Sequence, residues 1–305
     1  MEPRTARVHF GVGGWEHEVF DETFYPRGGM SSQEKLGYYA RFFDCVEVRS
    51  TFWDASLTAD DAREWAGAVA GIRSFVFHVK LHSAFTHAKT IQTSETNRMR
   101  GILHELAHRN RLGTLLVQFP YSFTNTSGNR YHVVKLSELF RGFTLHTEFR
   151  HESWNQPSIL PLLREHSLQS VSADLPRIKQ LMPFIAGHAG DIAYIRLHGR
   201  NDRGWLLNGF DTRYDYLYNA REIQELRRRI EALSKNCSDI YVVCNNTTAG
   251  KAIANALQLQ SATMDGRAVP VPRATLSAFP QLRQIADPKH GQETLFAPLP
   301  YREAM

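Results

Sequence analysis

Cysteine is scarce in this chain of 305 residues, which contains only Cys45, Cys237 and Cys244. No Cys-x-x-Cys pair occurs, and Cys45 and Cys244 fall in expected strands, where a buried free thiol is the simplest interpretation. The sequence also has no apolar signal core at its start and no apolar run long enough to span a bilayer. We therefore expect a cytoplasmic protein with reduced thiols and no membrane partner.

Several catalytic signatures are missing as well. The chain has no glycine-rich nucleotide fingerprint, no serine nucleophile elbow and no His-Glu-x-x-His metal motif. Their absence disfavours dinucleotide redox chemistry and serine-hydrolase chemistry. The formal net charge of +5 is compatible with anionic ligands but does not by itself indicate nucleic acid.

What the sequence does contain is a regular alternation of hydrophobic runs and helical patterns. The runs are rich in Val, Ile, Leu and Phe and predict eight strands, with amphipathic helices between them. This alternation is typical of an α/β fold of the (β/α)8 TIM-like barrel type, here spanning residues 1–262, and a doubly wound open sheet is the alternative. The strands are expected near residues 8–14, 44–50, 75–81, 112–119, 143–149, 168–174, 192–198 and 239–245, and the clearest helices at 33–42, 59–70, 95–109 and 222–233.

Beyond about residue 262 these periods stop, and six prolines punctuate the remainder. We expect residues 263–305 to form a Pro-rich C-terminal extension that wraps the barrel or is partly disordered. Within it, the segment Gln292-Glu293-Thr294-Leu295-Phe296 resembles the Gln-x-x-Leu-Phe peptide by which bacterial polymerases and repair proteins dock on the DNA sliding clamp. Gln292, Leu295 and Phe296 are therefore candidate partner-binding residues, and the alternative is that Leu295 and Phe296 anchor the extension to the barrel.

Ionisable residues recur at the ends of the expected strands, separated by single apolar residues. Side chains alternate between the two faces of a strand, so the apolar members can pack outward while the ionisable ones all point into the barrel. Burying charge is costly without partners, so strand ends that gather both signs indicate a site, with ion pairs that plug the barrel as the alternative. The alternation places in the lumen Glu47, Arg49, Lys80, Gln118, Glu148, Arg150, Asp174, Arg196 and His198.

These residue types can be assigned to acid/base chemistry on an anionic substrate. Paired carboxylates serve as general acid and base when their surroundings separate their pKa values, and we expect Glu148 as base with Glu47 or His198 as its acid partner. Lys80, Arg150 and Arg196 would stabilise a developing negative charge. The further candidates for substrate binding are Gln118, Asp174, Arg200, Asn245, Asn246, Trp15 and Trp154.

Two of these groups have a specific rationale. Barrels frequently bind phosphate in the loops after the seventh and eighth strands, where Arg200, Asn245 and Asn246 lie, although Asn residues also serve simply to satisfy turn backbone. Trp15 and Trp154 follow strands and could stack on a sugar or base, or could seal the core.

No cofactor is expected, but a divalent metal is a minor alternative. The side chains of His82, Glu148, Asp174 and His198 could converge as nitrogen and oxygen ligands. Arginine and lysine on neighbouring strands would repel a cation there, which weakens this interpretation.

An ordered set of motifs covers almost all of residues 8–260. The motifs are GVGGW (11–15), FYP (24–26), KLGYYARFFDCVEVRSTFW (35–53), FVFHVKL (75–81), FTH (85–87), LGTLLVQFP (112–120), EFRHESW (148–154), AD (173–174), RLHGR (196–200) and NNTTAGKAIANA (245–256). This set resembles the YecE-like proteins, known as domain of unknown function 72, and the resemblance implies a TIM-like barrel and no established reaction. Arg49 and Trp53 stand where relatives are expected to have Asn and Tyr, and Val12-Gly13 replaces a more usual Thr-Ser.

Three functions follow from these features. The leading hypothesis is a barrel enzyme acting on a phosphate-bearing substrate; if the extension binds the clamp, that substrate is DNA and the reaction phosphodiester or damaged-nucleotide hydrolysis. The second is a sugar-phosphate isomerase or hydrolase. The third is a non-catalytic binding module that docks on the DNA sliding clamp.

Overall fold

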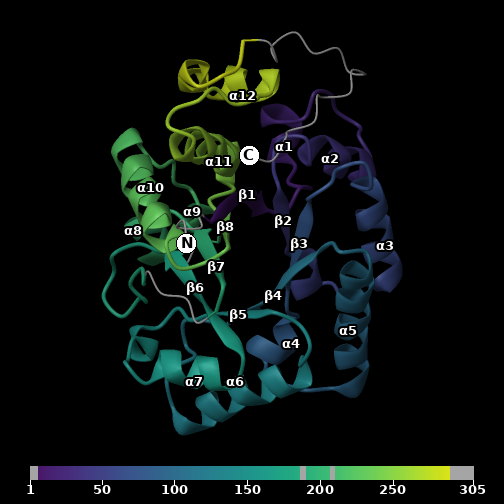
Figure 1. Cartoon of the computed structure of the whole chain (residues 1–305), viewed down its shortest axis with the longest axis vertical. Helices are drawn as coiled ribbons and strands as arrows, with labels where there is room; N and C mark the ends of the chain where they lie inside the picture. The colour runs from purple at the N-terminus through teal and green to yellow at the C-terminus, as the bar shows by residue number, and fades with distance from the viewer. Residues whose placement is uncertain (1–5, 186–189, 207–209, 289–305) are drawn as a thin grey trace, which may run out of the picture.

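Eight parallel strands close into a barrel in the order β1 to β8, with β8 pairing back onto β1 (Figure 1). The computed structural model describes residues 6–185, 190–206 and 210–288. The (β/α)8 barrel predicted from the sequence is confirmed, and each expected strand is present. The strands are β1 (Arg7–Gly13), β2 (Cys45–Val48), β3 (Val76–Lys80), β4 (Leu112–Gln118), β5 (Leu145–Glu148), β6 (Leu168–Asp174), β7 (Ile192–Leu197) and β8 (Asp239–Cys244).

Helices surround the barrel, as Figure 1 shows, and short 3₁₀ turns (η1 to η4) follow several strands. The four helices expected from periodicity correspond to α2, α3, α5 and α10. The α-helices are α1 (Val19–Thr23), α2 (Ser32–Tyr39), α3 (Ala59–Ala68), α4 (Ser83–Thr86), α5 (Thr93–His108), α6 (Ser127–Leu139), α7 (Ile159–Glu165), α8 (Asp202–Leu206), α9 (Phe210–Arg213), α10 (Ala220–Ser234), α11 (Lys251–Thr263) and α12 (Arg273–Ala278), and the 3₁₀ turns are η1 (Ser50–Phe52), η2 (Glu152–Trp154), η3 (Thr248–Gly250) and η4 (Pro280–Gln284).

The starts of these helices are fixed by local side-chain chemistry. Ser31 accepts a hydrogen bond from the backbone of Glu34, whose carboxylate accepts one from Ser31 in return, and Asn219 with Glu222 repeats the arrangement at α10. Such capping boxes satisfy backbone donors that the first helical turn leaves unpaired. The positions at which α2 and α10 begin are therefore encoded locally.

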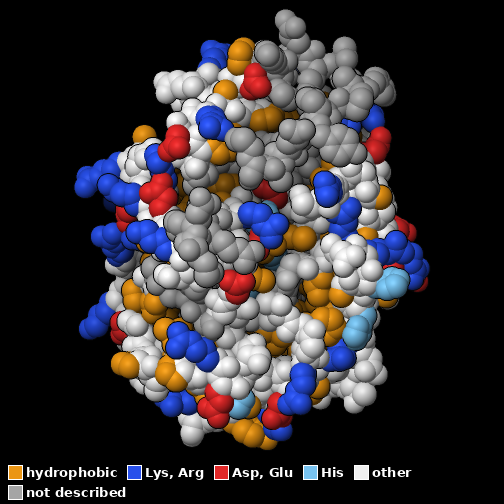
Figure 2. All heavy atoms as spheres, viewed as in Figure 1, with side chains coloured by type: hydrophobic (Ala, Val, Ile, Leu, Met, Phe, Trp, Pro, Cys, Tyr) orange, Lys and Arg blue, Asp and Glu red, His pale blue; other side chains and the backbone are white. Residues whose placement is uncertain are grey.

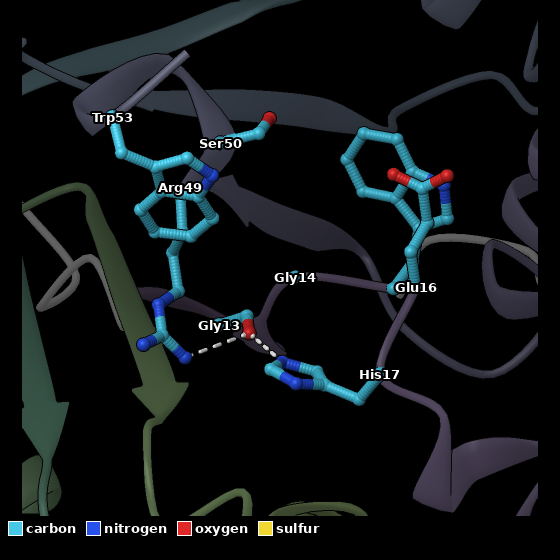
Figure 3. Close-up of a pocket in the computed structure, with 8 residues that line it drawn as sticks. Gly13, Gly14, Glu16, His17, Arg49, Ser50 and Trp53 are labelled. Atoms are coloured by element: carbon cyan, nitrogen blue, oxygen red, sulfur yellow. Dashed lines mark hydrogen bonds between the residues drawn. The ribbon is translucent and has the colours of Figure 1, made fainter. Parts of the chain in front are cut away.

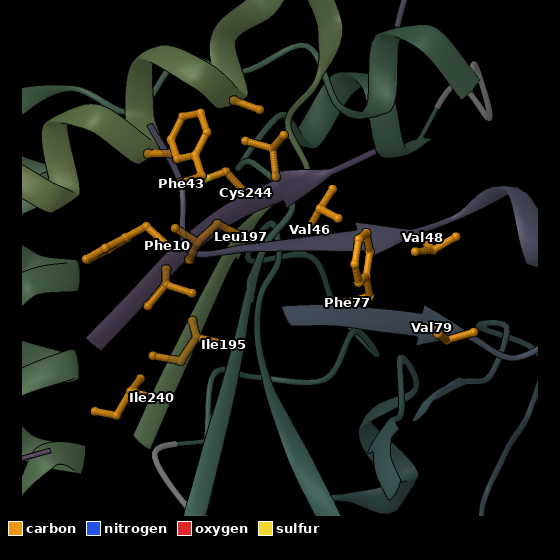
Figure 4. Packing of buried hydrophobic residues seen from close by; sticks show 14 of the residues in the cluster. Phe10, Phe43, Val46, Val48, Phe77, Val79, Ile195, Leu197, Ile240 and Cys244 are labelled. Atoms are coloured by element: carbon orange, nitrogen blue, oxygen red, sulfur yellow. The ribbon is translucent and has the colours of Figure 1, made fainter. Parts of the chain in front are cut away.

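Outward-facing strand residues form the core between the barrel and its helices (Figure 4). Val46 and Val48 of β2, Phe77 and Val79 of β3 and Ile195 of β7 are buried there. Because these residues alternate with the ionisable ones, burying them against the helices commits their neighbours to the lumen.

The lumen is filled with side chains in layers. Near its amino-terminal end, the ring of His78 lies 4.7 Å from that of Tyr194 and 4.5 Å from that of Tyr241. The Tyr194 hydroxyl then donates to Glu47 at 3.0 Å, which connects this aromatic layer to the charged layer above it. The charged residues therefore lie at the carboxyl-terminal end of the barrel, referred to below as the mouth.

The three cysteines are free and buried, which confirms that part of the sequence analysis. Within the described ranges, no helix combines the length and the apolar character that crossing a bilayer requires.

The described part of the C-terminal extension, residues 263–288, packs on the barrel. It contains two short helical turns, α12 and η4, where the sequence suggested none, because Pro272 and Pro280 stand at helix starts, where proline is tolerated. Val269 donates to Ile285 at 2.8 Å, and the Thr275 hydroxyl donates to the backbone of Thr23 at 2.8 Å. The extension is thus fastened to itself and to α1.

Candidate functional site at the barrel mouth

A buried ion network crosses the lumen between three strands. Arg196 of β7 binds Glu47 of β2 with two parallel hydrogen bonds, Nε to Oε2 at 2.8 Å and Nη2 to Oε1 at 2.6 Å. The same guanidinium donates from Nη1 to Glu148 of β5. All three side chains are almost completely buried. The predicted convergence of Glu47, Glu148 and Arg196 is therefore present in the structure.

Both carboxylates of this network are held in the ionised form. Burial alone would raise the pKa of Glu47 and of Glu148, but the charge and hydrogen bonds of Arg196 lower both, and His198 and Arg150 add to the effect on Glu148. The pKa of Glu148 lies well below its usual range. Both carboxyl groups are therefore ionised at neutral pH, which is the form that a base requires and an acid does not have. The assignment of Glu148 as base, with Glu47 or His198 as its acid partner, stays a prediction.

His198 contacts the same carboxylate. Its Nε2 lies 3.3 Å from Glu148 Oε1, while its Nδ1 has no hydrogen-bond partner within the described residues. Burial lowers the pKa of His198 to about 4, although the charge of Glu148 opposes the shift. The imidazole is therefore neutral at pH 7 and orients Glu148 by donating to it.

Positive charge exceeds negative charge at the mouth. Arg150 donates from Nε to Glu148 at 3.1 Å, whereas Arg49 and Lys80 make no ion pair with any described residue. Among the described residues, the Arg49 guanidinium makes one hydrogen bond, to the carbonyl of Gly13 at 3.4 Å. We refer to Arg49, Lys80 and Arg150 as the cation group.

Lys80 is the most unusual member of the cation group. Its side chain is buried, with 9% of the residue exposed, and its ammonium lies 3.8 Å from the ring centroid of Phe52. Burial, together with the charges of Arg196 and Arg49, moves the pKa of Lys80 well below its usual value. The amine therefore carries less positive charge at neutral pH than an exposed lysine does.

A first pocket of about 520 Å³ opens beside Arg49 (Figure 3). Trp53 forms one wall and is 61% exposed, while Glu16 lies across the pocket from the Arg49 guanidinium. His17 and Arg49 both point toward the carbonyl of Gly13, which His17 contacts at 2.6 Å. A side chain at position 13 would collide with the Asn245 side chain, so glycine at this position permits Asn245 to lie close to the β1 backbone.

A second pocket of about 420 Å³ opens beside Arg150, and it is lined by His87, Tyr121 and Trp205 among others. The guanidinium of Arg150 lies 5.4 Å from the Trp205 ring centroid. Lys80 lines neither pocket. The Phe52 ring beneath its ammonium, however, contacts Trp53 of the first pocket and His87 of the second.

Asp174 and Arg200 belong to a different network. Arg200 binds Asp174 with two hydrogen bonds, Nε to Oδ2 at 2.8 Å and Nη2 to Oδ1 at 2.9 Å, and it also contacts Glu225 of α10. Arg229 lies 3.4 Å from the same aspartate. Figure 2 shows basic and acidic side chains interspersed over α10. The structure therefore places Asp174 and Arg200, two of the predicted substrate-binding residues, in an ion network with α10. Their charges are already matched within that network.

Of the remaining substrate-binding candidates, four lie close to the mouth. Asn245 faces Arg196, and its amide oxygen can accept from Nη2 at 3.0 Å. Gln118 donates to the adjacent Phe119 backbone, and Asn246 donates to the backbone of Tyr216. Trp15 is 3% exposed yet lines the first pocket.

Trp154 does not reach the mouth. It is buried in a stack of aromatic rings, 4.0 Å from Phe149, and its indole donates to the backbone of Phe123 at 2.7 Å. Its contacts are those of a core residue.

Of the four metal-ligand candidates, Glu148 and His198 are in contact, but His82 and Asp174 do not join them. His82 lies 3.4 Å from Glu95, Asp174 is held by Arg200, and Glu148 is surrounded by arginines and His198. In the described part of the chain, no group of three or more His, Cys, Asp or Glu side chains is arranged to hold a metal. Metal binding through these residues stays a prediction that metal analysis of the purified protein would test.

Some features of the site were not accessible to sequence reasoning. Strand alternation predicts Arg49 in the lumen but not its lack of a carboxylate partner. Trp53 follows an expected strand and Tyr214 lies in an aromatic-rich loop, so both could be suspected near the mouth. Like His87, however, they lie on turns and loops, where no periodicity indicates the direction of a side chain. Tyr214 reaches Arg150 Nη2 at 3.4 Å, and Arg150 lowers the tyrosine pKa against the effect of burial. The clamp-like segment with Gln292, Leu295 and Phe296 lies outside the described residues.

A closed parallel barrel with charged strand ends and two pockets at its mouth defines a (β/α)8 barrel protein of the type that places its ligand site in the loops after the strands. The family model for the "Protein of unknown function DUF72" matches residues 9–277, and the chain belongs to this family. The family resemblance found in the sequence motifs is confirmed.

Relatives agree with this assignment. The UPF0759 protein YunF of Bacillus subtilis is 26% identical over 269 residues, covering 83% of this chain and 93% of that protein. The crystal structure of a DUF72 family protein from Thermotoga maritima has a TM-score of 0.74 at 28% identity, covering 85% of this chain and 99% of the other. A DUF72 family protein from Enterococcus faecalis has a TM-score of 0.73 at 26% identity, covering 84% and 95%.

Proposed function

We propose that this protein is a barrel enzyme for a phosphate-bearing substrate, and that the cation group binds the phosphate. The observation that carries the proposal is the charge of the mouth. Among the described residues, the guanidinium groups of Arg49, Arg150 and Arg196 face two buried carboxylates, Glu47 and Glu148. Lys80 adds a partial positive charge beside them. Buried positive charge without a partner is unfavourable, and a dianion between Arg49 and Arg150 would supply the missing negative charge.

The carboxylates take a positioning role in this proposal. Glu47 and Glu148 are ionised and already bound to Arg196, so they fix the cations instead of exchanging protons. The loop after β8, the other expected phosphate position, is less suitable because α1 packs against the turn that contains Gly250. Thr23 of α1 lies so close to Gly250 that a side chain there would collide with it. We therefore place the phosphate at the cation group.

The two pockets favour a compact substrate. Volumes of about 520 and 420 Å³ suit a sugar phosphate or a single nucleotide taken out of its stack. The exposed face of Trp53 provides a surface for a sugar ring or a base. Hydrolysis of a damaged nucleotide in DNA and isomerisation or hydrolysis of a sugar phosphate both remain within this proposal.

Titration with inorganic phosphate and with a sugar phosphate tests the binding site. Arg49→Gln and Arg150→Gln should each weaken binding roughly 10- to 100-fold, since a hydrogen bond to a charged group contributes about 1.5–3 kcal/mol. Arg63→Gln is the matched control, because Arg63 lies on the surface of α3 and pairs with Asp60. Equal affinities in wild type and in both mouth variants, measured calorimetrically, would contradict the proposal.

A further inference from the structure

Building on the proposed phosphate site, we propose that Lys80 is a catalytic amine that forms an imine with the carbonyl carbon of a phosphorylated sugar aldehyde. The aldehyde would belong either to a free sugar phosphate or to the deoxyribose of an abasic site in DNA. Both sources present the same chemistry, a carbonyl carbon and a phosphate on one sugar.

The position of Lys80 supports this role. It stands at the end of β3, and its ammonium lies on the Phe52 ring that contacts Trp53 of the first pocket and His87 of the second. Its charge also interacts with those of Arg49 and Arg150, which would hold the phosphate. Its ammonium lies on the Phe52 ring and has neither a hydrogen bond nor an ion pair among the described residues. A carbonyl carbon on the sugar whose phosphate sits between Arg49 and Arg150 would therefore be presented to an amine that is not otherwise engaged.

A second lysine, Lys35, is partly buried and shows what is distinctive about this arrangement. Lys35 also lies over an aromatic ring, 5.4 Å from the Tyr25 centroid, and its side chain is only 13% exposed. Lys35, however, binds Asp21 at 2.7 Å, which keeps its charge matched. Lys80 makes no ion pair with a described residue, and the charges of Arg196 and Arg49 each act on it more strongly than that of Glu47. A lysine desolvated beside other cations is an activated nucleophile.

The chemistry of the step is balanced by the amine and the aldehyde alone. The lone pair of Lys80 Nζ forms the C–N bond, and the carbonyl π electrons move to oxygen. That oxygen takes up both amine protons and leaves as water, which gives a C=N bond. The low pKa of Lys80 supplies the neutral amine that this attack requires.

Borohydride trapping tests the inference. The full-length protein is incubated with 2-deoxyribose 5-phosphate or with an oligonucleotide containing one abasic site, reduced with sodium borohydride and analysed by mass spectrometry with peptide mapping. We expect a borohydride-dependent adduct on Lys80 in at least one arm, and the arm that reacts identifies the source of the aldehyde. The adduct should be at least tenfold weaker with 2-deoxyribose, which lacks the phosphate.

Two variants separate the imine from the phosphate site. Lys80→Arg cannot form the imine, so it should abolish the adduct, while Arg49 and Arg150 still bind phosphate and phosphate still raises the melting temperature of the variant. Lys35→Arg should retain the Lys80 adduct. If phosphate binds the wild type but no adduct maps to Lys80 in either arm, the imine is overturned and the phosphate site stands. If phosphate does not bind the wild type, both proposals fail.

Discussion

Arg196 donates to both buried carboxylates of the lumen, and its own guanidinium is 3% exposed. Removing one partner from a buried ion pair leaves an uncompensated charge, which is far more costly than the pair itself is favourable. The stability of the mouth therefore depends on the completeness of this network.

We expect Arg196→Met to lower the free energy of unfolding by about 3–5 kcal/mol, because Glu47 and Glu148 would lose their main counter-charge. Urea unfolding at pH 7 measures the loss. Adding Glu47→Gln to Arg196→Met should recover part of it, since one unpaired carboxylate is removed and the two changes are not additive. A loss below about 1 kcal/mol in the single variant would show that the network contributes little.

The buried histidines make stability depend on pH. Burial lowers the pKa of His146 and of His198 to about 4 and that of His78 well below its usual value. In the unfolded chain these imidazoles become protonated near pH 6.5, whereas in the folded chain they stay neutral down to about pH 4. Acid therefore favours the unfolded state, and the free energy of unfolding falls as the pH falls from 7 to 5.

His78→Leu should reduce this acid sensitivity. Both ring nitrogens of His78 lack hydrogen-bond partners within the described residues, so leucine removes no favourable contact of theirs. We expect the loss of unfolding free energy between pH 7 and pH 5 to be smaller than that of the wild type by on the order of 1–2 kcal/mol. Urea titrations at both pH values test this, and an identical loss in both proteins would show that His78 does not contribute.

At the scale of elements, helix α10 connects the barrel to the outer ion network. Its capping residue Asn219 fixes where the helix starts, and Glu225 on its exposed side holds Arg200. The helix also buries Ile223 and Leu226 against the barrel. Removing the Asn219 cap should therefore destabilise the first turn of α10 without altering the cation group.

We expect Asn219→Ala to lower the free energy of unfolding by about 1 kcal/mol, because the backbone donor of Glu222 loses its acceptor. Asn236→Ala, just beyond the same helix, is the matched control, since the Asn236 side chain makes no hydrogen bond in the described structure. Thermal unfolding compares the two. Equal melting temperatures for both variants would argue against the cap.

At the scale of the whole molecule, the described part of the C-terminal extension adds buried apolar contacts that should contribute to the free energy of unfolding. Leu282 is 1% exposed and Val269 is completely buried, and Asp287 donates back to Val269 at 2.9 Å. Leu282→Ala should therefore cost about 2–5 kcal/mol, as expected for a large-to-small change in a core. Urea unfolding checks this value, and a cost near zero would mean that the extension packs only loosely.

The clamp hypothesis concerns residues beyond this fastened segment. If Leu295 and Phe296 form a clamp-binding peptide, replacing both with alanine should abolish capture by purified sliding clamp and leave the melting temperature unchanged. A lower melting temperature with unchanged capture would instead support their role as barrel anchors. The pair of measurements distinguishes the two hypotheses.

The sequence by itself determined the barrel, its strands and its main helices. Alternation of apolar and ionisable residues along each strand is local information, and burying Val46 and Val48 outward leaves no other direction for Glu47. The same alternation predicted that Glu148 and Arg196 would point into the lumen.

Only the tertiary structure decided how the charges pair. Glu47 and Arg196 are 149 positions apart, and they meet because the closed barrel brings β2 and β7 across one lumen. The pairing of Asp174 with Arg200 depends in the same way on which side chains come within hydrogen-bond reach. So does the lack of a hydrogen-bond partner for the Lys80 ammonium among the residues that the structure describes. Strand periodicity sets the direction of a side chain, whereas its charge state is set by neighbours that are distant in sequence.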